Sequence, residues 1–220
     1  MKRVAGLVFA AVLGAACMSG GEQSSPPTGA HVHWLLYGDS LSDGAAPYLR
    51  MYDTVGDRHR QSTAPCDWVG GLDGDPTVYS PDIVLLQFLG NPSCERGDRE
   101  QAYEQDLTTI AQFWIARRVP VVMVLSPKTP TDDYAWARVA ELRVADVLGL
   151  GVRNAGAAVE APGEEFTYFL PCLATEGAAQ GCGAELVDQI RVRASDGVHF
   201  GFSTPAYSAG AFRFAAAMAT

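Results

Sequence analysis

The stretch "LLYGDSLSDG", residues 35–44, decides the fold of this chain. An apolar run stops abruptly at Gly38-Asp39-Ser40, and small and polar residues follow it. This change predicts a buried strand that ends in a tight turn. Ser40 then lies at the carboxyl end of the strand, where a serine can cap a helix or act as a nucleophile. Because Gly-Asp-Ser is common in turns, the choice depends on the rest of the chain.

Strands and helices alternate beyond residue 30. Continuous apolar runs predict buried strands at residues 31–38, 81–90 and 119–126. Apolar residues at helical intervals predict helices at residues 98–118 and 132–150. Shorter patterns predict a helix at 46–55, strands at 58–62 and 151–156, and a last helix at 204–219 capped by Thr204. Strands separated by helices, without hairpin signals, favour parallel pairing through right-handed crossovers and therefore an α/β fold.

The composition is that of one globular domain. Of the 220 residues, 48% are hydrophobic and 19% are charged, and the formal net charge is −9. An acidic surface repels phosphate backbones, so we expect no nucleic-acid partner. The sequence has no Cys-x-x-Cys pair and no Gly-x-x-x-x-Gly-Lys loop, so zinc-ribbon and P-loop sites have no support.

Residues 1–17, "MKRVAGLVFAAVLGAAC", predict an export signal. Lys2 and Arg3 give the segment a basic start, and its apolar stretch at 4–16 is too short to span a bilayer comfortably. The segment would be removed on export, and the folded domain would lie in an oxidising compartment.

Cys17 follows three small residues, an arrangement similar to a bacterial lipobox. The similarity predicts that this cysteine is lipidated, and ordinary cleavage nearby is the alternative. Residues 18–30 have the composition of a flexible tether, so residues 31–220 would form the domain. We therefore expect the protein at the outer face of the cell membrane through a lipid anchor only, or secreted.

Two further segments hold residue types suited to acyl transfer. Asp196 and His199 lie three residues apart in "SDGVHF", so the carboxylate can reach Nδ1 of the imidazole and fix its tautomer. Nε2 is then free to take a proton from a serine hydroxyl. Asn91 follows the strand predicted at 81–90, at the same sheet edge as Ser40, and its amide can donate to a developing oxyanion.

These three segments, in this order, resemble the SGNH (GDSL) hydrolase family over most of residues 31–220. The resemblance implies a three-layer α/β/α sandwich with about five parallel strands and no metal or organic cofactor. It implies that Ser40 is the nucleophile, that Asp196 and His199 are the acid–base pair, and that Asn91 and the Ser40 backbone N–H are oxyanion donors. The segments "APCDWV", "LQFLGNPSC", "FLPCL" and "VRASDGVHF" also resemble exported actinobacterial members.

One element of the family pattern is missing. The second backbone donor usually comes from a glycine about thirty residues before the asparagine, and Gln61-Ser62-Thr63 stands there instead. Ser62 can supply the same N–H, although a side chain narrows the pocket and the backbone angle φ must suit it. Gly70 is the competing candidate, and a plain helix-terminal role for Ser62 is the alternative.

Four cysteines would remain after removal of Cys17. If the loops around Cys66 and Cys94 both line the oxyanion pocket, a disulfide between them would hold the donors in place. Cys172 and Cys182 would then close a loop before the Asp196 segment. Four cysteines allow three pairings, so this pairing is a hypothesis.

Arg191 and Arg193 precede the same loop, where they would either attract an anionic substrate or form edge charges.

These residues lead us to expect an exported, monomeric serine esterase. Its expected substrates are acyl esters, with short O-acyl groups on envelope polysaccharide or lipid as the first guess. One alternative is an acyltransferase that uses the same acyl-serine, and another is a catalytically weak envelope-binding module.

Overall fold

The computed structural model describes residues 32–91, 94 and 97–220. The predicted export signal, Cys17 and the tether lie outside these residues. Within the described ranges, no helix is long and apolar enough to cross a membrane.

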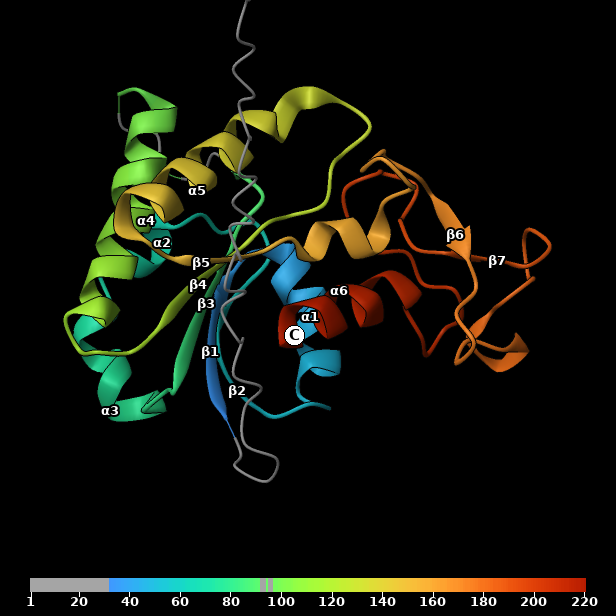
Figure 1. Cartoon of the computed structure of the whole chain (residues 1–220), viewed down its shortest axis with the longest axis horizontal. Helices are drawn as coiled ribbons and strands as arrows, with labels where there is room; N and C mark the ends of the chain where they lie inside the picture. Colours follow the sequence, from blue (N-terminus) through green and yellow to red (C-terminus); the bar gives the residue numbers. More distant parts are fainter. Residues whose placement is uncertain (1–31, 92–93, 95–96) are drawn as a thin grey trace, which may run out of the picture. The chain divides into compact units, whose positions relative to one another are not determined.

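Five strands form one parallel sheet in the order β2-β1-β3-β4-β5 (Figure 1). The strands are β1 (His33–Gly38), β2 (Thr54–His59), β3 (Ile83–Gln87), β4 (Val121–Val124) and β5 (Gly151–Arg153). The chain order reverses direction beside β1, and in such sheets ligands bind outside the carboxyl ends of the strands at that point. Ser40 and Asn91 follow two of the neighbouring strands, so the topology alone brings them to one edge.

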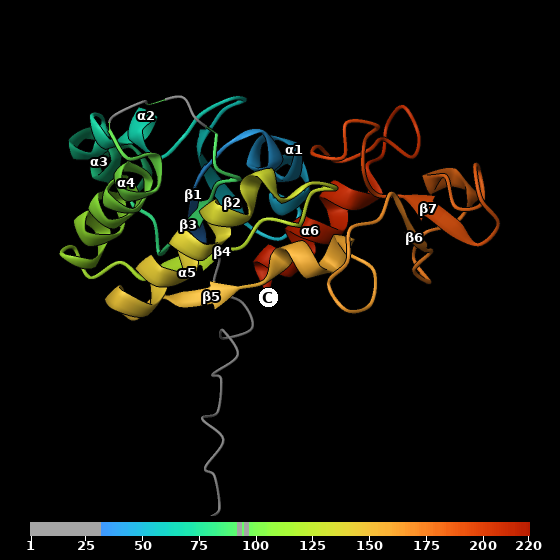
Figure 2. The same cartoon turned by 90° about the horizontal axis from the view of Figure 1, so that it is seen from above.

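Helices cover both faces of the sheet (Figure 2). On one face lie α1 (Ser40–Leu49) and α6 (Ala209–Ala219), packed on Leu36 and Leu85. The other face carries α2 (Cys66–Val69), α3 (Asp75–Tyr79), α4 (Arg99–Ile115) and α5 (Ala135–Leu148). Successive strand residues point to opposite faces, so Leu35 and Leu86 enter this second core. The predicted three-layer α/β/α architecture is confirmed.

The sequence prediction differs from the structure in several places. The helix expected at 46–55 begins earlier, at Ser40, and ends at Leu49, and β2 already begins at Thr54. The strand expected at 58–62 begins earlier, at Thr54, because β2 is a half-buried edge strand without a continuous apolar run. The last helix begins at Ala209, and Ser208 caps it by accepting from the Ala211 N–H at 3.3 Å. Thr204 instead pairs with Tyr207 in a preceding turn. A two-stranded antiparallel sheet of β6 (Phe169–Pro171) and β7 (Gln189–Arg191) was not predicted.

Candidate active site

Ser40, His199 and Asp196 form a continuous chain of hydrogen-bond contacts. The Ser40 hydroxyl lies 2.9 Å from Nε2 of His199, and Nδ1 of the same ring lies 2.7 Å from Asp196 Oδ2. The serine opens α1 directly after β1, whereas the other two residues come from the loop before α6. The imidazole is about half exposed, with 49% of its side-chain surface accessible. The predicted three residues are therefore assembled at a site that a substrate can reach.

The Asp196 carboxylate is oriented by its own loop. Its Oδ1 accepts the backbone N–H groups of Val198 and His199 at 2.8 and 2.9 Å, which leaves Oδ2 for the imidazole. Partial burial acts to raise the pKa of Asp196, but hydrogen bonds from the His199 ring and from these backbone groups outweigh it and lower the pKa. The carboxylate is therefore charged at neutral pH and can stabilise an imidazolium.

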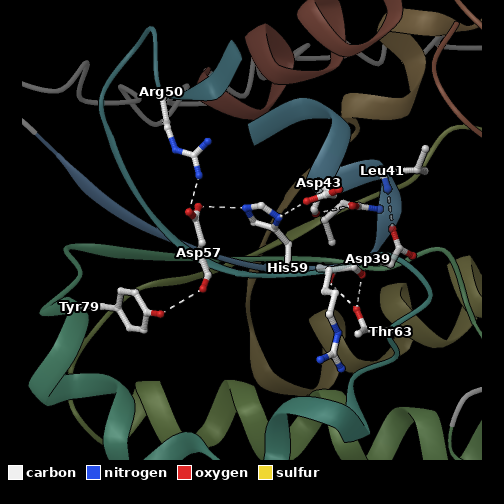
Figure 3. Close-up of polar contacts among 12 residues, drawn as sticks. Asp39, Leu41, Asp43, Arg50, Asp57, His59, Thr63 and Tyr79 are labelled. Atoms are coloured by element: carbon white, nitrogen blue, oxygen red, sulfur yellow. Dashed lines mark hydrogen bonds and ion pairs between the residues drawn. The ribbon is translucent and has the colours of Figure 1, made fainter. Parts of the chain in front are cut away.

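Asp39, the residue before the serine, is fully buried and caps α1 (Figure 3). Its carboxylate accepts the N–H of Leu41 at 3.0 Å and the N–H of Leu89, beyond β3, at 2.6 Å. Burial raises its pKa to about 6, although these two hydrogen bonds act in the opposite direction. Asp39 thus joins the turn that presents Ser40 to the segment that carries Asn91.

The Asn91 side chain lies beside both the Ser40 turn and the Ser62 loop. Its amide nitrogen donates to the Thr63 carbonyl at 3.0 Å and has a long contact of 3.5 Å with Asp39 Oδ2. Among the described residues, one amide hydrogen is thus used by Thr63, and the other has only the long contact with Asp39. Donation to a substrate oxygen needs that second hydrogen.

Ser62 has the backbone conformation that glycine adopts most readily, with φ at +58°. It is exposed, and the next residue, Thr63, is the one that contacts Asn91. Gly70 ends α2 with an ordinary φ of −71°. Among the described contacts, it is therefore the Ser62 segment, and not Gly70, that meets the Asn91 side chain.

The structure pairs Cys66 with Cys94 and Cys172 with Cys182, which is the expected pairing. The first disulfide joins the segment after Ser62 to the segment after Asn91. Among the described residues, the group with metal-ligand side chains is Cys66, Asp67 and Cys94. Because both sulfur atoms already belong to the disulfide, this group does not form a metal site.

The two arginines before the Asp196 loop do not form an anion site. Arg191 is paired with Glu185. Arg193 is only 1% exposed, and its Nη2 donates to the carbonyls of Gly197 at 2.7 Å and Lys128 at 3.3 Å. Of the two alternatives, attraction of an anionic substrate is not supported for Arg193, and it is not an edge charge either, because its side chain is buried and donates to the loop.

Sequence reasoning missed a second histidine near α1, the helix that begins with Ser40. His59 ends β2, and its two ring nitrogens lie 3.2 Å from Asp43 of α1 and 3.0 Å from Asp57 (Figure 3). Asp57 in turn accepts from Arg50, at the end of α1. This network ties both ends of the helix that begins with Ser40 to the edge strand. The polar residues of β2 form no recognisable sequence motif, so the sequence alone did not predict this network.

No protein-family model and no curated protein matches the sequence. The fold, however, is similar to several solved structures. A GDSL-like lipase from Bacteroides thetaiotaomicron is 13% identical, with a TM-score of 0.57 and 84% of each chain covered. A lipase/acylhydrolase from Enterococcus faecalis is 16% identical, with a TM-score of 0.54, covering 84% of this chain and 92% of that one. An α/β hydrolase from a Lake Arreo metagenome is 15% identical, with a TM-score of 0.58 and coverages of 86% and 94%.

Proposed function

We propose that the chain is a serine hydrolase of carboxylic esters. The observation that carries this proposal is the chain of contacts from Asp196 through His199 to Ser40, with distances of 2.7 and 2.9 Å. A serine hydroxyl is a weak nucleophile until an adjacent base takes its proton. The fold shared with GDSL-type lipases and acylhydrolases supports the same reaction class.

In the proposed mechanism, His199 Nε2 takes the Ser40 proton while Oγ attacks the ester carbonyl carbon. Asp196 stabilises the imidazolium that forms. The second amide hydrogen of Asn91 and the backbone N–H groups of Ser40 and Ser62 would hold the oxyanion. His199 then gives its proton to the leaving alcohol, and a water molecule, activated by the same imidazole, releases the acid from the acyl-serine.

We further propose that this reaction takes place outside the cytoplasm, on acyl esters of envelope polysaccharide or lipid. The signal-like residues 1–17 and the two disulfides support an exported protein. A lipid on Cys17 would keep it at the membrane. If so, Cys17→Ser should move the protein from the membrane fraction to the medium, and an unchanged distribution would refute the anchor.

Hydrolysis of p-nitrophenyl acetate, butyrate and octanoate by the exported protein tests the enzymatic function. Ser40→Ala should remove turnover of all three esters, with an unchanged melting temperature as the control for folding. If wild type and variant are equally inactive, a catalytically weak envelope-binding module becomes the better interpretation. The Asn91 amide would then be occupied by the Thr63 carbonyl and would not act as an oxyanion donor. Acyl transfer to an added sugar in preference to water would identify an acyltransferase.

A further inference from the structure

A cavity of about 360 Å³ opens next to the proposed active site. Its walls come from the segment after β3, the segment after β4, the first turns of α5, and Phe166. We call it the α5 cavity. The apolar side chains that shape it are Phe88, Leu89, Tyr134, Val139, Leu142 and Phe166.

Both sides of the α5 cavity adjoin catalytic segments. On one side, the backbone N–H of Leu89 donates to Asp39, the neighbour of Ser40, at 2.6 Å. On the other side, Phe166 lies against Gly197, where a side-chain carbon on the glycine would lie 3.4 Å from its ring. Gly197 belongs to the loop between Asp196 and His199. The cavity therefore lies between the segment bonded to the residue before Ser40 and the loop that carries Asp196 and His199.

Two charged residues of the cavity wall, Arg138 and Glu141, have partners within the protein. Arg138 donates to the Ser126 carbonyl at 2.9 Å and to Asn154 at 3.1 Å. Glu141 is only 1% exposed and accepts from the Tyr103 hydroxyl at 3.0 Å. Burial, together with the nearby Asp39 carboxyl, raises the pKa of Glu141 well above its usual range, which favours its uncharged form. An apolar chain therefore meets no unpaired charge from these two residues.

The volume limits the length of the occupant. A carbon-sized group takes roughly 30 Å³, the share of one water molecule in the liquid, so the cavity holds roughly a dozen such groups. An acetyl group would leave most of it empty. An unbranched chain of about eight to ten carbons would fill it, and each buried methylene would add about fourfold to transition-state binding.

We propose that the α5 cavity binds the acyl chain of the substrate and gives the site a preference for medium-length acyl groups. This inference rests on the proposed ester hydrolysis and replaces the short acyl group expected from the sequence. The alcohol part of the ester would leave on the side of Ser40 away from Leu89. A second partly exposed valine of α5, Val147, does not line the cavity and provides a matched control.

The test compares Val139→Trp with Val147→Trp. For each protein, kcat/KM is measured on p-nitrophenyl acetate and p-nitrophenyl octanoate. Val139→Trp should lower the octanoate-to-acetate ratio at least tenfold, whereas Val147→Trp should leave it within twofold of wild type. Leu142→Ala should move the optimum to longer acyl chains. Equal ratios in the two tryptophan variants, together with an unmoved optimum in Leu142→Ala, would overturn the proposal.

Two further measurements separate the possible failures. Ethyl and octyl esters of the same acid test the alcohol side, and a Val139→Trp effect confined to the octyl ester would assign the cavity to the alcohol and overturn the acyl proposal. Calorimetric titration of octanoate into Ser40→Ala does not depend on turnover. If no ester is hydrolysed but octanoate binds and Val139→Trp weakens it, the enzymatic function fails and the apolar site stands. If esters are hydrolysed but octanoate neither binds nor is favoured as an acyl group, the cavity proposal is wrong and the proposed ester hydrolysis stands.

Discussion

Asp39 and Ser40 are neighbours with opposite surroundings. The carboxylate is fully buried, while the serine hydroxyl faces a half-exposed imidazole. The abrupt start of α1 after β1 produces this difference, because the capping residue points back into the protein and the next residue points out at the sheet edge. A buried cap therefore holds Ser40, the proposed nucleophile, at a site open to substrate.

Asn91→Ala tests the oxyanion role at this scale. Removal of one donor from such a site typically lowers the rate by about 10²–10³. We expect a loss of kcat in this range, with KM nearly unchanged, because the interaction forms mainly in the transition state. The measurement is steady-state hydrolysis of p-nitrophenyl butyrate. Asn154→Ala, at the other asparagine of the chain, serves as the control, and wild-type kcat in Asn91→Ala would contradict the role.

Asp39 should make the stability of the protein depend on pH. Its pKa is raised by burial from 3.8 to about 6, so the folded protein holds this proton more tightly than the unfolded chain. Its contribution to the free energy of unfolding is therefore greatest below about pH 4 and is lost as the pH rises through about 6, a change of about 3 kcal/mol. The side chain of Asp39→Asn does not titrate in this range, so this contribution to the pH dependence of the free energy of unfolding is absent from the variant.

Urea unfolding of both proteins at pH 4 and pH 7.5 measures this effect. The free energy of unfolding of wild type, relative to that of Asp39→Asn, should be higher at pH 4 than at pH 7.5 by about 2 kcal/mol, because part of the effect is already lost at pH 4. The other acids titrate in both proteins, so their contributions largely cancel in the comparison. A difference that does not change with pH would contradict the burial of an ionisable Asp39.

At the scale of elements, loops rather than strands hold the site together. The Cys66–Cys94 disulfide closes a separation of 28 residues between the Ser62 and Asn91 segments, whereas Cys172–Cys182 closes 10. By loop entropy, their loss should cost about 3–4 and about 2–3 kcal/mol of stability, respectively. The first disulfide joins two proposed donor segments, so its loss should also lower kcat.

Paired cysteine-to-alanine replacements, one disulfide at a time, check both expectations by thermal unfolding and ester hydrolysis. The double replacement at 172 and 182 is the matched control for the general effect of losing a disulfide. Equal kcat values in the two double variants, measured well below their melting temperatures, would show that the Cys66–Cys94 disulfide has no specific effect on catalysis.

Arg193 should act as a positioning residue for the catalytic loop. Burial lowers its pKa to about 10, so it stays charged at neutral pH and donates to the Gly197 carbonyl. Arg193→Met removes this contact and should lower kcat by between about tenfold and a hundredfold through misplacement of His199. The loss should be the same for acetate and octanoate esters, with little change in KM. A loss that depends on chain length would place the effect in the α5 cavity.

The sequence patterns predicted the elements that pack a core and missed those that do not. Buried strands and long helices carry strong apolar periodicity, so β1, β3, β4, α4 and α5 were predicted close to their observed positions. The edge strand β2 is half exposed, and β6 and β7 have three residues each, too few for any period to be visible. Their positions depend on tertiary contacts and on the second disulfide, which sequence patterns do not contain.

At the scale of the whole molecule, the site joins residues that are far apart in the chain. Ser40 and His199 are separated by 159 positions, yet their side chains lie 2.9 Å apart. The parallel topology explains why Ser40 and Asn91 share one edge, because they follow β1 and β3, whereas the loop that carries His199 follows β7, outside this sheet. The α5 cavity and the inward turn of Arg193 were not predictable, since both depend on how side chains pack between elements.

The central claim is that Ser40 is a nucleophile activated by His199, and a fluorophosphonate probe tests it most directly. The folded, disulfide-bonded protein is treated with the probe, and the modified peptide is identified by mass spectrometry. The account predicts one phosphonyl group per chain, attached to Ser40, and at least a hundredfold slower labelling of His199→Ala. No labelling of the folded wild-type protein, or labelling at a residue other than Ser40, would contradict it.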